Sequence, residues 1–284
     1  MLCINIMSKY RIKKITANIE VLKPLVTDKL PLGYKYINHA YPNILLLAKK
    51  NSGKTNIIYN LLKRCANAST EVIIFCPTVD LDSTYKMIID YLDSKNIPHQ
   101  QFKNLDNLET LLLSYDPKNK LIDVKDDSED DSEEEPFTPT DCLSQIEVKE
   151  KPTKEKKRPL PKSKFIVPEH IFIFDDLKEK MRNKVFNELI ATNRHYNAKV
   201  IISTHSITDL LPGARSCLDV MCLFPKIPID SLYKLFEDVE LSTDHNEVID
   251  LYKQATEHDH NFLYVDIRRE LYSFNFDKKI IKND

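Results

Sequence analysis

The sequence predicts an α/β fold with a central, mostly parallel sheet flanked by helices. Three observations support this prediction. An apolar stretch at residues 44–47 runs into a loop that ends in Gly-Lys-Thr, and a second apolar stretch at residues 171–174 ends in Asp-Asp. Between and after them, short apolar stretches alternate with segments of helical periodicity, which is typical of parallel strands joined by right-handed helical crossovers.

The loop after the first strand matches the phosphate-binding pattern G-x-x-x-x-G-K-[ST], except that alanine replaces the first glycine. Backbone N–H groups in such a loop converge on phosphates at a helix N-terminus, where the helix dipole also favours negative charge. The lysine adds a cation for the β- and γ-phosphates, and the threonine hydroxyl can ligate Mg²⁺. We therefore predict ATP and Mg²⁺ as ligands. The predicted nucleotide-binding residues are Ala48, Lys49, Lys50, Asn51, Ser52, Gly53, Lys54 and Thr55.

Two carboxylates follow the second strand. Four consecutive large apolar residues at 171–174 indicate a strand buried on both faces, and ligands of α/β sheets bind beyond the C-terminal ends of such strands. We predict that Asp175 and Thr55 hold Mg²⁺, and that Asp176 is the catalytic base that orients an attacking water. The alternative for the Asp-Asp pair is a helix N-cap.

The other elements are predicted from periodicity, in chain order. Loose alternation of apolar residues at 10–23 indicates one or two accessory strands ahead of the main fold. Helices are expected at residues 55–65, 82–95, 104–115, 177–194, 229–238 and 245–256. Strands are expected at residues 71–76, 199–203 and 217–224, and a hairpin at residues 262–266 and 270–276.

A charged segment interrupts this pattern. Residues 123–135 contain nine acids in thirteen positions, and residues 149–164 contain eight bases in sixteen. Such a segment cannot bury enough apolar area to offset its chain entropy, so we predict a disordered acidic and basic insertion at 117–165. Its basic half is either an arm that contacts DNA or a partner, or a solvated segment neutralised by the acidic half; we favour the second. The remaining predicted units are an N-terminal extension at 1–27 and a single domain at 28–116 and 166–284.

Composition excludes several classes of protein. The 284 residues carry a formal charge of −2, so there is no overall basic footprint, and any DNA contact must come from a local patch. No apolar run approaches the roughly 18 residues of a membrane span, so none is expected. The six cysteines show no C-x-x-C pairing, which argues for reduced thiols and against a disulfide framework or a zinc site. His258-Asp259-His260 has metal-ligand residue types, but its polar surroundings favour a plain turn.

The strand expected at 199–203 ends in the polar sequence Ser203-Thr204-His205. If this strand lies between the two motif strands, its polar end faces the γ-phosphate. His205 is then positioned to sense phosphate or to position water, and we include it among the predicted catalytic residues. The alternative, a surface histidine without a role, carries equal weight on spacing alone.

Residues 193–205, Asn-Arg-His-Tyr-Asn-Ala-Lys-Val-Ile-Ile-Ser-Thr-His, resemble the segment that leads into and through the sensor strand of the FtsK/HerA superfamily. The sequence is more similar to the viral DNA-packaging ATPases of poxviruses, giant viruses, virophages and polinton-like elements. The resemblance spans roughly residues 28–276 apart from the charged insertion. Further matching segments are Phe-Cys-Pro-Thr at 75–78, Phe-Asp-Asp-Leu at 174–177, Leu-Pro-Gly-Ala-Arg at 211–215, the apolar strand up to residue 224, and Phe-Leu at 262–263.

This resemblance implies a P-loop NTPase of the RecA/ASCE-like type that works as a homo-oligomeric ring and couples ATP hydrolysis to pumping double-stranded DNA into a preformed capsid. By the same resemblance, Lys54 binds phosphate, Asp175 holds the metal and Asp176 activates water. Arg194 matches a proposed arginine finger that acts on the neighbouring subunit's nucleotide; without the resemblance, a surface charge at a helix end would be preferred. The implied partners are capsid or portal-vertex proteins, and the implied location is the viral assembly site in the host cytoplasm and the virion.

The sequence departs from the family pattern at two positions. Ala48 replaces the first loop glycine, so that turn must tolerate a Cβ atom. His205 stands where the family usually has glutamine, and its charge varies near neutral pH. Two alternatives stay open: a P-loop nucleotide kinase, although residues 117–165 offer no arginine-rich lid, and a non-catalytic nucleotide-binding assembly factor, which the two departures make plausible.

Overall fold

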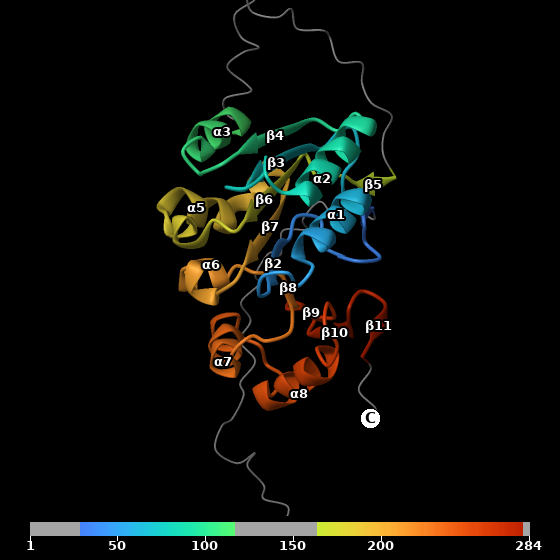
Figure 1. The fold of residues 1–284 in the computed structure, drawn as a ribbon, viewed down its shortest axis with the longest axis vertical. Coiled ribbons are helices and arrows are strands. Elements are labelled where there is room, and N and C mark those ends of the chain that lie inside the picture. Colours follow the sequence, from blue (N-terminus) through green and yellow to red (C-terminus); the bar gives the residue numbers. More distant parts are fainter. Residues whose placement is uncertain (1–28, 117–163, 281–284) are drawn as a thin grey trace, which may run out of the picture.

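The computed structural model describes residues 29–116 and 164–280, and a nine-stranded sheet runs through them (Figure 1). Its strand order is β11-β10-β9-β8-β2-β7-β6-β3-β4. The strands are β2 (Asn43–Leu47), β3 (Glu71–Phe75), β4 (His99–Phe102), β6 (His170–Asp175), β7 (Ala198–Thr204), β8 (Val220–Leu223), β9 (Leu263–Asp266), β10 (Leu271–Phe274) and β11 (Lys278–Lys279).

Strand β7 lies between β2 and β6, and it pairs with both in parallel. In this register Leu47 faces Thr204, and Asp175 faces Ser203, so the two motif strands and the polar strand end at the same edge of the sheet. The six strands from β8 to β4 are parallel, whereas β9, β10 and β11 pair antiparallel. The sheet is therefore mostly parallel, as predicted.

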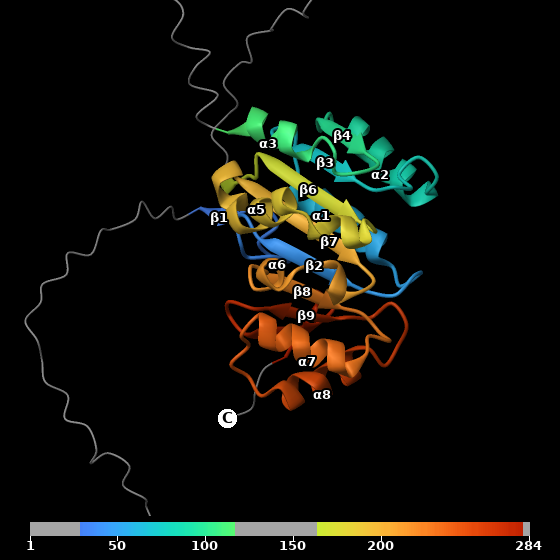
Figure 2. The ribbon, with the colours of Figure 1, turned by 90° about the vertical axis from the view of Figure 1, so that its left-hand side faces the viewer.

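Helices cover both faces of the sheet (Figure 2). Each face has its own apolar core. One face packs against α1 (Lys54–Cys65) and α2 (Ser83–Ser94). The other face is covered by α3 (Leu108–Tyr115), α5 (Lys184–Thr192), α6 (Pro212–Arg215), α7 (Ile229–Asp238) and α8 (His245–Ala255). All residues of β2, β6 and β7 are buried, which explains why these strands appear in the sequence as apolar runs without alternation.

Most predicted elements are confirmed, including the hairpin of β9 and β10, but two predictions are wrong. The helix expected at 177–194 is broken into a 3-10 turn (Lys178–Arg182), α5, and a second 3-10 turn (Asn193–Tyr196). The break occurs at Asn183, whose side chain accepts a hydrogen bond from Phe186 N at 2.7 Å and thus caps a new helix. Strand β4 was not predicted, because its sequence His-Gln-Gln-Phe has no apolar run.

A separate two-stranded parallel sheet joins β1 (Leu30–Pro31) to β5 (Phe165–Ile166). Phe165 therefore belongs to the folded part, and the predicted insertion ends slightly too late. Residues 117–163 of that insertion, and the accessory strand predicted at 10–23, lie outside the described residues.

Two further features concern the described part of the chain. Its cysteines, Cys65, Cys76, Cys217 and Cys222, are free thiols. Within residues 29–116 and 164–280, no helix has both the length and the apolar character needed to span a membrane.

Candidate nucleotide-binding site

The predicted phosphate loop connects β2 to α1 at the C-terminal edge of the sheet. Two of its residues adopt left-handed backbone conformations, Asn51 with φ 63° and Gly53 with φ 93°. Asparagine and glycine are the residues that adopt this conformation most readily, so the loop sequence suits its shape. The backbone N–H groups at the start of α1 remain available to bind an anion, as expected of such a loop.

Ala48 does not disturb the loop. It is not among the described residues with positive φ, so its backbone has no need of glycine. Its side chain is 1% exposed and packs in the apolar core beneath α1. The Cβ atom that the sequence analysis identified as a possible obstacle therefore stabilises the base of the loop by burial.

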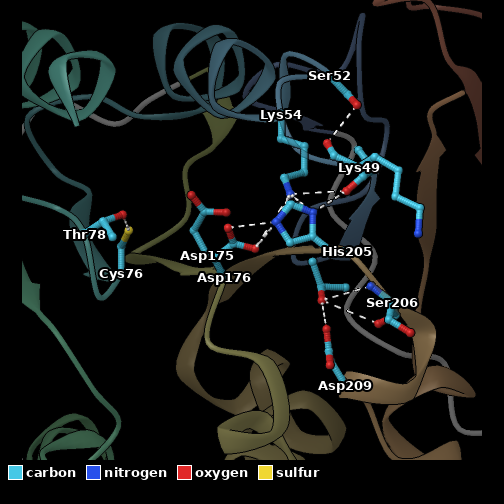
Figure 3. A network of polar contacts seen from close by, with 12 residues as sticks. Lys49, Ser52, Lys54, Cys76, Thr78, Asp175, Asp176, His205, Ser206 and Asp209 are labelled. Atoms are coloured by element: carbon cyan, nitrogen blue, oxygen red, sulfur yellow. Dashed lines mark hydrogen bonds and ion pairs between the residues drawn. The ribbon is translucent and has the colours of Figure 1, made fainter. Parts of the chain in front are cut away.

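Lys54 points from the start of α1 toward the ends of β6 and β7 (Figure 3). Its ammonium lies 3.3 Å from Ala48 O, 2.9 Å from His205 Nδ1 and 3.8 Å from Asp176 Oδ1. Burial lowers the pKa of Lys54, and the nearby carboxylates of Asp176 and Asp175 act in the opposite direction. The buried lysine thus lies in a cluster of polar groups at the predicted position of the phosphates.

Asp175 is the last residue of β6, and its carboxylate is 7% exposed. Its Oδ2 accepts a hydrogen bond from the Tyr85 hydroxyl at 2.9 Å, while its buried Oδ1 has no hydrogen-bonding partner among the described residues. Burial raises the pKa of Asp175, and the adjacent Ser203 and Tyr85 hydroxyls oppose this shift. An unsatisfied buried carboxylate oxygen that lines the same cavity as Thr55 fits the oxygen ligands that Mg²⁺ prefers.

We expect Asp175→Asn to stabilise the nucleotide-free protein at neutral pH. Because burial raises the pKa of Asp175 in the folded state, ionising it costs folding free energy as the pH rises through that pKa, and the cost disappears at lower pH, where the folded and unfolded states both hold the proton. Thermal denaturation in EDTA should show a Tm about 2–4 °C higher, the shift that roughly 1 kcal/mol produces in a protein of this size.

The gain in Tm should shrink as the pH falls into the acidic range. Asp90→Asn, on the exposed side of α2, is the matched control and should leave the Tm unchanged. Added Mg²⁺ and ATP should raise the Tm of the native protein more than that of Asp175→Asn. A lower Tm for Asp175→Asn in EDTA would mean that the carboxylate stabilises the fold.

Asp176 and His205 form a pair next to Lys54. His205 Nε2 lies 2.9 Å from Asp176 Oδ2 and 2.8 Å from Oδ1, so the ring donates to the carboxylate. His205 Nδ1 lies 2.7 Å from Ala48 O and 2.9 Å from Lys54 Nζ. A neutral ring accepts from Lys54 through this nitrogen, whereas a charged ring donates to Ala48 O. Strand β7 lies between the motif strands, so the condition set for His205 in the sequence analysis is met.

These groups line one cavity of about 620 Å³. It is lined by residues 50–56 of the loop and helix α1, by Asp175, Asp176 and His205 from the ends of β6 and β7, and by residues of two further segments. Asp176 adopts φ 53°, a left-handed conformation that ends strand β6. The Asp-Asp pair is therefore not the N-cap of a helix: the next helical residues form a 3-10 turn whose N-cap is Leu177, which offers no side-chain cap.

Arg194 is not part of this cavity. It precedes β7, whereas His205 follows it, so a seven-residue strand separates them, about 20 Å at the usual rise per residue. Its Nη2 lies 3.6 Å from Oδ1 of the buried Asp219, which also contacts Arg268 Nη2 at 2.5 Å. The Arg194 side chain is 58% exposed. Arg194 thus lies at the N-terminal ends of the parallel strands, whereas the chain's own phosphate loop lies at their C-terminal ends.

Two residues that shape the site, Tyr85 and Asp209, were not predicted from the sequence. Tyr85 donates to Asp175, and burial holds the pKa of Tyr85 well above its usual value, so it remains a donor. Asp209 accepts a hydrogen bond from Thr204 at the end of β7. Tyr85 is one of the buried positions of α2, and its spacing in the sequence does not mark it as a neighbour of Asp175.

Comparison with known proteins gives a likeness in structure but none in sequence. No protein-family model and no curated protein matches the chain. A solved structure of the genome packaging NTPase B204 from Sulfolobus turreted icosahedral virus 2, in complex with AMP, matches with a TM-score of 0.51 and 15% identity over 86% of this chain and 100% of that one. The DNA-packaging ATPase B204 from Sulfolobus turreted icosahedral virus matches with a TM-score of 0.48 and 14% identity, over 84% and 98%.

The chain has a P-loop NTPase fold. At this identity the likeness establishes the fold alone, and it confirms the predicted fold class. In this P-loop NTPase fold, the inserted strand β7 between the loop strand and the Asp-Asp strand fits the RecA/ASCE-like type predicted from the sequence.

Proposed function

We propose that this chain is an ATPase that drives double-stranded viral DNA into a preformed capsid. The observation that supports ATP hydrolysis best is the convergence of Lys54, Asp175, Asp176 and His205 in one cavity beyond the phosphate loop. Phosphoryl transfer to water requires groups of these kinds: a cation that binds phosphate, a carboxylate that binds the metal, a second carboxylate, and a polar residue from the inserted strand. Ala48 does not count against turnover, because its Cβ is accommodated.

Each group has a proposed role. The loop from Ala48 to Thr55 binds the phosphates through its backbone N–H groups, and Lys54 leaves His205 and Asp176 to contact the β- and γ-phosphates. Asp175 and Thr55 would hold Mg²⁺, which supplies charge neutralisation for the β- and γ-phosphate oxygens when bound. Asp176 orients and deprotonates the attacking water. His205, released from Lys54, donates to the γ-phosphate or to the water through Nδ1 or Nε2.

DNA packaging is proposed from two further arguments. The structure matched at a TM-score of 0.51 is described as a genome packaging NTPase, and the motifs at 193–205 resemble viral packaging ATPases. Arg194 lies at the opposite edge of the sheet from the chain's own nucleotide, as a finger for a neighbouring subunit would. We therefore propose a homo-oligomeric ring that docks on capsid or portal-vertex proteins, at the viral assembly site in the host cytoplasm and in the virion.

The test is ATP turnover by the purified full chain with and without double-stranded DNA. Turnover stimulated by DNA and abolished by Lys54→Ala supports the motor, because the variant removes the phosphate-binding cation. Phosphate transfer to a nucleoside monophosphate would indicate a kinase instead. Binding of ATP without turnover under both conditions would leave a nucleotide-binding assembly factor and overturn the proposal.

A further inference from the structure

A cluster of cations follows the Asp-Asp pair directly. Residues 177–184, Leu-Lys-Glu-Lys-Met-Arg-Asn-Lys, contain four bases and one acid. The first three bases, Lys178, Lys180 and Arg182, lie in the 3-10 turn after β6, and all three are exposed. We call these three residues the basic turn. Within residues 29–116 and 164–280, their side chains form no hydrogen bond or ion pair, so their charges are available to a ligand.

Apolar residues between these cations hold the basic turn in place. Leu177 is 2% exposed and Met181 is fully buried, and both belong to the apolar core on that face of the sheet. Lys180 N donates to Leu177 O at 3.2 Å. Asp176 and Lys178 both adopt left-handed conformations with φ 53°, so the chain turns sharply on either side of Leu177. Because the backbone is already ordered, the cations can bind a ligand without a further cost of ordering the chain.

The basic turn is connected to both residues that line the cavity at the predicted γ-phosphate. Only Leu177 separates it from Asp176, the proposed base. The turn also packs against the 3-10 turn Ile207–Asp209, which begins two residues after His205. Figure 3 shows Asp176 and His205 in contact, as their distance of 2.9 Å requires. A displacement of either residue when the γ-phosphate leaves would therefore reach the basic turn within one or two residues of chain.

We propose that the basic turn binds the phosphate backbone of double-stranded DNA. This inference rests on the proposed function and adds to it the surface that contacts the DNA. The whole chain carries a formal charge of −2, so its attraction to a polyanion has to come from a local concentration of cations. Lysine and arginine side chains that contact phosphates hold the duplex without reading its sequence, and a packaging enzyme has to move DNA of any sequence.

The test measures binding of the full chain, without ATP, to two duplexes of unrelated sequence at several salt concentrations. The variant combines Lys178→Asn, Lys180→Gln and Arg182→Gln, and asparagine suits the left-handed backbone at position 178. Its affinity for both duplexes should fall about 10²-fold at low salt. The slope of log affinity against log salt should become shallower by about 2 to 3, because each phosphate contact contributes about 0.9. Glu179→Gln removes the one acid of the segment and should tighten binding.

The matched control combines Lys86→Gln, Lys95→Gln and Lys234→Gln, which remove the same net charge from exposed positions of α2, its C-terminal end and α7. It should keep the native affinity for both duplexes. In the same preparations, the basic-turn variant should keep its turnover of ATP without DNA and lose the stimulation by DNA.

Equal losses of DNA affinity in the variant and the control would mean that only net charge matters and would overturn the inference. Native affinity in the variant would overturn it too, and so would a native chain that does not bind the duplexes. If turnover stimulated by DNA survived in the variant, the proposed function would stand and the inference would fall. Selective loss of DNA binding in a chain that never hydrolyses ATP would support the basic turn and refute only the ATPase proposal.

Discussion

Replacing Asp176 with asparagine is expected to leave ATP bound and to lower its turnover by about 10²- to 10⁴-fold, the contribution typical of a general base. The amide cannot accept the proton of the attacking water, whereas Lys54, Asp175 and Thr55 are untouched. Asparagine suits the left-handed backbone at this position, φ 53°, so the end of β6 should keep its shape. Single-turnover hydrolysis and equilibrium ATP binding, measured on the same preparation, separate the two effects.

Two comparisons make this result specific. Lys54→Ala should lose affinity as well as turnover, because it removes the cation that contacts the phosphates. Asp176→Glu keeps a carboxylate and should retain more activity than the asparagine variant. If Asp176→Asn hydrolysed ATP within about tenfold of the native rate, the general base would have to be another group.

The second large effect is expected from Arg194→Ala, which should lower turnover by about 10³-fold or more if the guanidinium stabilises the transition state in a neighbouring subunit. The side chain is 58% exposed. It lies at the end of β7 that is remote from the chain's own phosphate loop, so it is too far away to contact the nucleotide bound to the same chain. Mixing Arg194→Ala subunits with Asp176→Asn subunits should then restore activity, because one kind supplies the base and the other the arginine.

With random assembly, about one quarter of the sites would combine an intact Asp176 with an intact Arg194 from the neighbour, and turnover should recover toward that fraction. Arg268→Ala is the matched control, since Arg268 contacts the same Asp219 and is also about half exposed. It should reproduce any loss of stability without the loss of turnover. Mixed oligomers that are verified by mass and remain inactive would refute a role of Arg194 in trans.

The parallel core could be predicted because its chemistry is local in sequence. Strands β2, β6 and β7 are buried throughout and consist mostly of consecutive apolar residues. β6 and β7 end in polar residues at the site, and β2 leads into the phosphate loop. Their order in the sheet is not local. That β7 lies between the other two, which brings His205 to Lys54 at 2.9 Å, is a property of the topology that the sequence analysis stated only as a condition.

Other contacts depend on side chains far apart in the chain and leave no pattern to detect. Tyr85 and Asp175 are 90 positions apart, and Asn43 N and Asp219 are 176 apart, yet both pairs are hydrogen-bonded. Strand β4 was not predicted because none of its residues is buried, so its sequence needs no apolar run. The turn at His258–His260 was correctly predicted as a turn, but its position beside Gly53 follows from the antiparallel hairpin that carries it there.

Strand β7 has a mechanical consequence. It is hydrogen-bonded along both sides and buried at every residue, so it has no freedom to stretch or bend by itself. Arg194 stands before one end of this rod and His205 after the other. In a ring of such chains, a displacement that starts where one subunit loses its γ-phosphate would reach the next subunit's nucleotide as a shift of the whole rod. The order in which the subunits of the ring hydrolyse ATP would then depend on the stiffness of a buried strand. No hinge inside the subunit would be needed.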